Sequence, residues 1–289
     1  MAAIRASIRK HPVLTYYALT FAISWGGALL VIGGPGGIPG TGEEIMRLMP
    51  LVMVAWFAGP SLAGILLTGL LDGRAGLREF GSRLVKWRVG ARWYAVALLT
   101  APFLMATILL AFSLSSPDFR PRLVTADDTV SLFAYGIISA LMTAFFEELG
   151  MTGFAVHRLR LSHSILGTGL IVGLLWGVWR SLVVVWAGSG AVGTLAPILF
   201  YSAGLFSWLP AFRVLMVWVY DRTGSLLVAF LMHTSLVASW TILTPLTITG
   251  VRLVTYYWVL TAALWVVVAA VALANRRQLS PQPPQPRMA

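Results

Sequence analysis

The sequence predicts an all-α polytopic membrane protein with about eight transmembrane helices. The 289-residue chain is 58% hydrophobic and only 11% charged, so it lacks the polar surface that a soluble domain of this length needs. The apolar residues gather in runs of about 20, the length that crosses the hydrocarbon core of a bilayer as a helix. The predicted spans are 13–33, 49–71, 93–114, 129–148, 164–184, 195–219, 225–247 and 252–274.

The first span is expected to stay in the mature protein. Arg5, Arg9 and Lys10 precede its apolar stretch, as basic residues do in a secretory signal peptide. The stretch from Val13 to Ile32 is nevertheless long enough to cross a bilayer and has no evident A-x-A cleavage site. We therefore expect a retained membrane helix.

The basic residues predict the orientation of the bundle. With an even number of spans and both termini inside, fifteen of the 21 Lys and Arg residues fall in inner segments and four in outer ones. Cytoplasmic loops are enriched in Lys and Arg, so we expect cytoplasmic termini and an integral protein of the plasma membrane. The net charge of +11 lies mainly in loops between apolar runs. It indicates contact with anionic membrane lipids and no binding of nucleic acid.

Residues 72–92, between the second and third spans, are predicted to form an amphipathic helix. Leu77, Phe80, Leu84 and Trp87 recur at helical spacing, with basic residues between them. This pattern is typical of a helix that lies on the inner membrane surface. A lipid-facing anchor is the simpler interpretation, and guidance of a substrate is the alternative.

Five ionisable side chains fall inside the predicted spans: Glu147, Glu148, Arg180, Arg213 and His233. Charged groups at membrane depth are costly and persist where they face a bundle interior or a water-filled cavity and find partners. Glu147 and Glu148 point about 100° apart on a helix, so one can face a cavity while the other packs against a partner. Arg213 lies about two turns from the inner end of its span and is expected to reach the headgroups. His233 alone is equally consistent with a hydrogen-bonding contact between helices.

Three stretches resemble the motifs of the CPBP family, in the family's order and spacing. The first motif, EExxxR and usually a glycine, resembles residues 147–155, EELGMTGFA. The second, an aromatic residue and three others before a histidine, resembles residues 174–180, LLWGVWR. The third, HxxxN or HxxxB, resembles the stretch around His233, which follows YDRTGSLL at 220–227. The chain is thus similar to the CAAX-processing and bacteriocin-processing intramembrane proteases, type II CAAX prenyl endopeptidases among them.

The resemblance implies a fold and a division of the chain. The expected fold is the helical bundle of a CAAX protease. Residues 1–128 are expected to hold the first three spans and the helix at 72–92, and residues 129–247 the CPBP-like catalytic core. Residues 248–289 are expected to hold the last span and a disordered, proline-rich tail.

The resemblance also implies roles for the intramembrane residues. In active relatives the first glutamate activates a water that attacks the scissile carbonyl, while histidines and an asparagine orient the water or stabilise the oxyanion. Carried over to this chain, Glu147 is the base, Glu148 stands beside it, and His233 binds the water or the oxyanion. Such a base is chemically reasonable because burial brings a carboxylate into a range useful for proton transfer.

Three motif positions depart from the family. Thr152 replaces the motif arginine, Arg180 replaces the second histidine, and Val237 replaces the closing asparagine. A guanidinium neither accepts a proton nor binds zinc, so Arg180 is expected to donate to an oxyanion or to neutralise Glu147 or Glu148, with snorkelling outward as the alternative. The remaining carboxylates and His233 stand next to this cation. We therefore expect no metal and no cofactor.

The residues leave three functions open. The first is an intramembrane endopeptidase that cleaves a membrane-associated peptide or protein through Glu147, Glu148, His233 and Arg180. The second is a catalytically inactive pseudoprotease that binds such a peptide or partner, which the three departures support. The third, a transporter or proton relay, lacks the internal repeat and paired broken helices of such proteins. The sequence alone does not decide whether the chain is an enzyme.

Overall fold

The part of the chain that the structure describes is an all-α bundle. The structure, a computed structural model, describes residue 6, residues 8–188 and residues 204–274. The main helices are α2 (Pro12–Ile32), α3 (Gly42–Leu84), α4 (Ala91–Ser113), α6 (Thr129–Gly150), α8 (Ile165–Ala187), α11 (Trp208–Thr223), α12 (Leu226–Leu243) and α13 (Gly250–Ala274). Shorter turns lie between them: η1 (Pro35–Gly37), η2 (Pro117–Phe119), α5 (Arg122–Thr125), a π-helical turn (Met151–Val156) and α7 (His157–Leu159).

Seven helices within the described residues are long and apolar enough to cross a membrane. Each overlaps one of the spans expected from the sequence, which confirms the all-α polytopic class. The remaining expected span, 195–219, lies outside the described residues as far as residue 203, and its residues 208–219 belong to α11. The expected disordered tail at 275–289 also lies outside the described residues.

Side-chain caps define where the helices of the core begin. Asp128, Ser164 and Ser225 precede α6, α8 and α12, and each side-chain oxygen accepts a hydrogen bond from the backbone N–H three residues on. Such a cap satisfies one of the N–H groups that a helix start leaves without a partner. Gly224 ends α11 in the left-handed region at φ 57°, where glycine carries no Cβ penalty.

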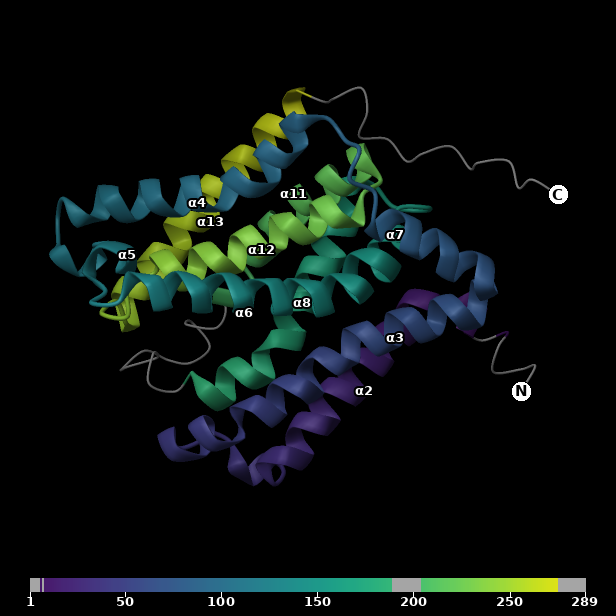
Figure 1. Cartoon of the computed structure of the whole chain (residues 1–289), viewed down its shortest axis with the longest axis horizontal. Helices are drawn as coiled ribbons and strands as arrows, with labels where there is room; N and C mark the ends of the chain where they lie inside the picture. Colours follow the sequence, from purple (N-terminus) through teal and green to yellow (C-terminus); the bar gives the residue numbers. More distant parts are fainter. Residues whose placement is uncertain (1–5, 7, 189–203, 275–289) are drawn as a thin grey trace.

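The helices are arranged so that α6 and α8 occupy the middle of the bundle. Figure 1 shows α2 and α3 side by side, with α4, α11, α12 and α13 on the other side of α6 and α8. Helix α6 packs against both α3 and α12, and α8 packs against α11. Helix α12 also contacts α11, so α6, α12, α11 and α8 form a connected series of packed helices.

Glycines on α8 allow α11 to approach closely. A Cβ on Gly169 would lie 2.5 Å from the Cα of Val214, and a Cβ on Gly173 would lie 2.5 Å from the Cα of Pro210. Apolar side chains gain little by leaving lipid for protein, so membrane helices associate mainly through such close packing of small residues. The two glycines, one turn apart, therefore fix the α8–α11 pair.

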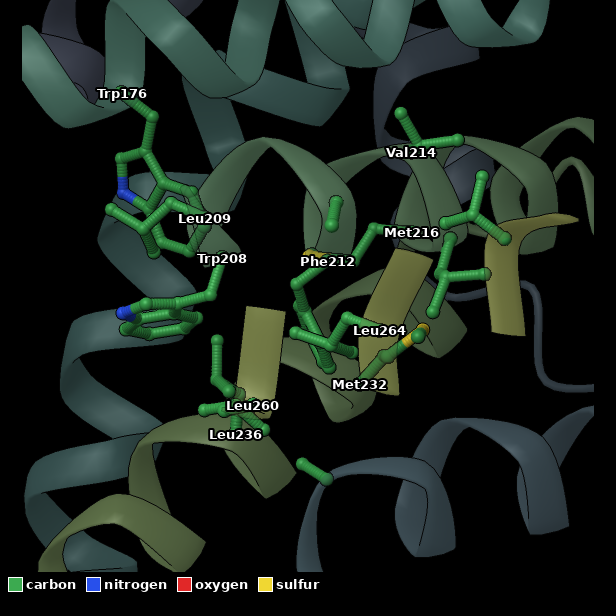
Figure 2. Close-up of a cluster of buried hydrophobic side chains, with 14 of the residues drawn as sticks. Trp176, Trp208, Leu209, Phe212, Val214, Met216, Met232, Leu236, Leu260 and Leu264 are labelled. Atoms are coloured by element: carbon green, nitrogen blue, oxygen red, sulfur yellow. The ribbon is translucent and has the colours of Figure 1, made fainter. Parts of the chain in front are cut away.

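The largest buried cluster lies where α8, α11, α12 and α13 meet. Figure 2 shows Trp176 of α8 and Trp208, Leu209 and Phe212 of α11 in this cluster. Met232 and Leu236 of α12 and Leu260 and Leu264 of α13 complete the labelled set, together with Val214 and Met216. This packing holds α11 and α12 in register beside the polar residues described below.

The expected amphipathic helix is shorter and more buried than the sequence indicates. Gly73, at φ 65° and ψ −153°, breaks α3, and residues 74–84 form its last arm. The helix stops at Leu84 and does not reach residue 92; beyond it, the Ser225 hydroxyl donates to the carbonyl of Lys86. Phe80 is 6% exposed and packs against Leu149 and Leu226. Its apolar face thus covers protein, in part, where a lipid contact was expected.

Candidate active site

Glu147 lies fully buried in the last turn of α6 and accepts hydrogen bonds from two donors. Arg180 of α8 donates from Nη1 to Glu147 Oε1 at 2.8 Å. Trp176, one turn earlier on the same helix, donates from Nε1 to Glu147 Oε2 at 2.7 Å. The ion pair expected between α6 and α8 is therefore present, and Arg180 does not snorkel outward. A carboxylate at this depth is retained because both of its oxygens are hydrogen bonded.

Glu148 accepts hydrogen bonds from three other helical segments. Arg213 of α11 approaches it through Nη1, at 2.9 Å from Oε1 and 3.0 Å from Oε2. His233 of α12 lies with Nδ1 2.8 Å from Oε1. The hydroxyl of Thr152, one turn beyond Glu148, donates to Oε2. The two glutamates thus have separate partners, as their different directions on the helix require.

Arg213 corrects an expectation from the sequence. It does not reach the headgroups, because its side chain is 0% exposed and paired with Glu148. The close α8–α11 contact brings its Cβ to 3.2 Å from where a Cβ on Gly173 would lie. Its guanidinium also lies 4.3 Å from the centre of the Trp176 ring, within the range of a cation–π contact. A buried anion and an aromatic face therefore replace the headgroup as its partners.

His233 is held with one ring nitrogen engaged and the other free. Glu148 faces Arg213 and is therefore ionised and accepts only, so the contact at Nδ1 assigns the ring proton to Nδ1. Nε2, then an acceptor, has no hydrogen-bond partner among the described residues and lies 3.9 Å from Glu147 Oε2. The ring is 0% exposed and meets the Trp176 ring edge-on, at 5.0 Å between centroids. A buried nitrogen without a partner is unusual and calls for a function.

A cavity of about 200 Å³ adjoins this cluster. Arg180 and His233 of the cluster line it, and Val237 lines it at the position of the family's asparagine. Trp176, Trp208 and Trp240 form much of its aromatic wall, and the latter two rings are stacked 5.5 Å apart. The remaining lining residues are Val184, Gly204, Leu205, Leu209, Leu236 and Tyr257. An apolar group with one polar end fits such a cavity.

The π-helical turn begins three residues after Glu148. It spans Met151–Val156 and is buried throughout, and such turns are frequent at functional sites. In a π-helical turn the backbone hydrogen bonds join residues five apart instead of four. The carbonyl of Gly153, inside this turn, accepts a hydrogen bond from Arg83 at 3.2 Å. Arg83 also donates to the Tyr220 hydroxyl at 2.7 Å. The last arm of α3 therefore secures the segment that carries Thr152.

The side chains present do not suit a bound metal ion. Within the described ranges, no group of three His, Cys, Asp or Glu residues could hold one. Each glutamate is paired with an arginine, and Nδ1 of His233 is engaged by Glu148. Two cations beside the donors would oppose a third.

The four candidate catalytic residues predicted from the sequence meet at one place: Glu147, Glu148, Arg180 and His233. The sequence had not assigned Arg213, Thr152 and Trp176 to this cluster. Thr152 lies four residues after Glu148 and Trp176 four residues before Arg180, spacings that share a helix face. Arg213 has a weaker signal, since its contact depends on the tight packing of two helices.

Fold and site together define an integral membrane protein with a buried carboxylate, arginine and histidine cluster beside an apolar cavity. Residues 129–239, which contain the whole cluster, match the family model of the Type II CAAX prenyl endopeptidase Rce1-like proteins. The chain is also 20% identical over 238 residues to CAAX prenyl protease 2 of Methanococcus maripaludis, a match that covers 79% of this chain and 83% of that protein. Through this region the chain is similar to the CAAX protease family, as its motifs indicate.

Proposed function

We propose that this chain is an intramembrane endopeptidase that hydrolyses a peptide bond of a membrane-associated peptide or protein. The observation that carries the proposal is the unpartnered Nε2 of His233, which stands 3.9 Å from a glutamate oxygen at the edge of an apolar cavity. Two proton acceptors that face each other at this distance can hold one water between them. The family match of residues 129–239 supports the same chemistry.

Glu147 and His233 are the groups that activate the water. One water hydrogen points to Glu147 Oε2 and the other to His233 Nε2, both within about 2.8 Å of a water oxygen placed between them. Glu147 takes one proton as the water oxygen forms its bond to the scissile carbonyl carbon. His233 keeps the water's remaining hydrogen in place, because Glu148 fixes the orientation of its ring.

Arg180 is the proposed hydrogen-bond donor to the carbonyl oxygen of the scissile peptide bond. It is 30% exposed, lines the cavity, and uses Nη1 for Glu147. Its other N–H groups are available to the oxyanion of the tetrahedral intermediate, the role implied for a histidine in relatives. A fixed donor at such a place is worth about 3 kcal/mol. The proton on Glu147 then passes to the leaving nitrogen, the C–N bond breaks, and a carboxylic acid and an amine result.

The cavity suggests the kind of substrate. Its wall consists mainly of tryptophan, leucine and valine side chains. A peptide bound with its carbonyl at Arg180 would place an apolar side chain in this space. Residues 129–247 then form the catalytic core. The protein would lie in the plasma membrane with both termini in the cytoplasm.

A second function, binding without cleavage, has one observation in its favour. Both glutamates are ion-paired with arginines, so the guanidinium groups occupy carboxylate lone pairs that a general base would use. In particular, the Arg180 ion pair could disable Glu147. The chain would then hold a membrane peptide in the same cavity and leave it intact.

Cleavage of a panel of membrane-peptide reporters by the purified chain separates these functions. The wild type should yield product, and Glu147→Gln should lower kcat by about 100-fold or more, since general base catalysis contributes that much. Glu79→Gln is the matched control, because Glu79 is 61% exposed and outside the cluster. Silence of the wild type with activity in Arg180→His would favour the non-cleaving function. Silence of both proteins on the panel contradicts the proposed protease.

A further inference from the structure

We infer that Arg213 is a positioning residue: from α11 it supplies the positive charge that the family motif carries at position 152, and it thereby keeps the ring proton of His233 on Nδ1. The inference deepens the proposed function and rests on it. It concerns a residue that does not itself touch the substrate. Its geometric basis is the buried chain of contacts from Arg213 through Glu148 to His233.

The first step is that Arg213 holds the charge of Glu148. Its Nη1 lies within 3.0 Å of both carboxylate oxygens, and both side chains are essentially unexposed. A buried carboxylate that loses its only cation becomes a neutral acid. The other two neighbours of Glu148, Thr152 and His233, carry no fixed charge. The ionised state of Glu148 therefore depends on Arg213.

The second step is that the charge of Glu148 decides which nitrogen of His233 is free. An ionised carboxylate only accepts hydrogen bonds, so it requires N–H at Nδ1. A neutral carboxylic acid can instead donate to Nδ1, which would move the ring proton to Nε2. Nε2 is the nitrogen that faces Glu147. With a proton on it, His233 could no longer accept from the water.

The third step is that Arg213 occupies the place of the motif arginine. Its Nη1 lies 3.4 Å from Thr152 Oγ1, so its guanidinium stands against position 152 itself. Thr152 is 1% exposed, so a longer side chain at this position would have to displace its neighbours, Arg213 among them. The loss of an arginine at 152 and the buried arginine on α11 are thus complementary. We therefore expect that an arginine at position 152 can replace the charge of an arginine removed from position 213.

The packing of α8 against α11 makes the arrangement possible. Pro210, three residues before Arg213, lies against Gly173, and Val214, directly after Arg213, lies against Gly169. The Trp176 ring covers the guanidinium at 4.3 Å while its Nε1 binds Glu147. Arg213 is therefore joined to the catalytic glutamate on one side and to His233 on the other.

The experiment is an exchange of charge between positions 152 and 213, with two readouts. The variants are Arg213→Met, Arg213→Lys, Thr152→Arg, and Thr152→Arg with Arg213→Met. The first readout is the ¹⁵N spectrum of histidine-labelled full-length protein in lipid nanodiscs, which distinguishes the ring tautomers. The chain has four histidines, so His233→Gln assigns the signal. The second readout is reporter cleavage.

We expect the wild type and Arg213→Lys to show His233 protonated on Nδ1, and Arg213→Met to lose this preference. The kcat of Arg213→Met should fall about 100-fold, less than the ~10⁴-fold cost of losing an orienting carboxylate, with KM within about threefold. The double variant should regain the wild-type tautomer and most of kcat. Thr152→Arg alone should do worse than the double variant, because two arginines cannot share the space.

An unchanged His233 spectrum in Arg213→Met overturns the inference, as does a double variant no better than Arg213→Met. If Arg213→Met does not fold, the double variant Glu148→Gln with Arg213→Met, which removes both buried charges, is measured in its place. That pair should show a mixture of tautomers, and a pure Nδ1–H signal would contradict the inference. The spectrum does not require cleavage. Failure of the proposed protease and failure of this inference are thereby distinguishable.

Discussion

The ion pair between Glu147 and Arg180 should be measurable as a large coupling in a double-mutant cycle. Arg180→Gln removes the cation and leaves Glu147, which is 0% exposed, with Trp176 as its remaining donor. With charge centres about 4 Å apart, the attraction is about 4 kcal/mol at an effective dielectric constant of 20. Part of this offsets desolvation, so we expect Arg180→Gln to cost about 3 kcal/mol. Glu147→Gln, which also removes the charge, should cost about 1 kcal/mol.

The double variant should be little worse than Glu147→Gln, which gives a coupling energy of about 3 kcal/mol. The assay is reversible unfolding in mixed dodecylmaltoside and dodecylsulfate micelles, followed by tryptophan fluorescence and circular dichroism. Arg252 and Asp118 form a matched control pair, because their side chains are 56% and 36% exposed. A coupling below about 1 kcal/mol is expected there. Additivity within about 0.5 kcal/mol at Arg180 and Glu147 would refute a buried ion pair.

Other positions give independent tests. Gly173→Leu should destabilise the protein by about 3 kcal/mol or more, because its Cβ would meet Pro210, whereas Gly26→Ala, with open space around it, should cost nothing in unfolding midpoint. Hydrogen bonds from Ser131 lower the pKa of Asp128, the cap of α6. The folded pKa lies below the unfolded value, so this contribution is present above the usual Asp pKa of 3.8 and is lost as pH falls through the lowered value. Asp128→Asn should remove that part of the pH dependence of the melting temperature. Cleavage should survive treatment with chelators, and loss that zinc restores would contradict a metal-free site.

Much of the fold could be predicted because a bilayer imposes a simple rule on sequence. Runs of about 20 apolar residues appear wherever a helix crosses, and seven such helices lie among the described residues. The bend of α3 at Gly73 could not be predicted in the same way. The local pattern of residues 72–92 does not predict that Phe80 packs against Leu149 and Leu226. Those contacts depend on the tertiary arrangement.

In the candidate site, too, some residues could be predicted from the sequence and one could not. Glu147, Glu148, Arg180 and His233 could be found because charged groups at membrane depth are rare and stood at motif positions. The place of Arg213 was predicted wrongly, since distance from the helix end favoured a headgroup contact. Arg213 instead forms an ion pair with Glu148 of another helix. Sequence spacing reports faces of one helix and says little about which helices approach each other.

The most direct test of the central claim, that this cluster hydrolyses a peptide bond, is cleavage in water enriched in ¹⁸O. The purified chain would be incubated with a membrane-peptide reporter, and the products of a single turnover would be weighed by mass spectrometry. We predict one ¹⁸O atom in the newly formed carboxyl group, and no labelled product from Glu147→Gln or His233→Gln. Labelled product from both variants at the wild-type rate, or no product from the wild type, would contradict the account.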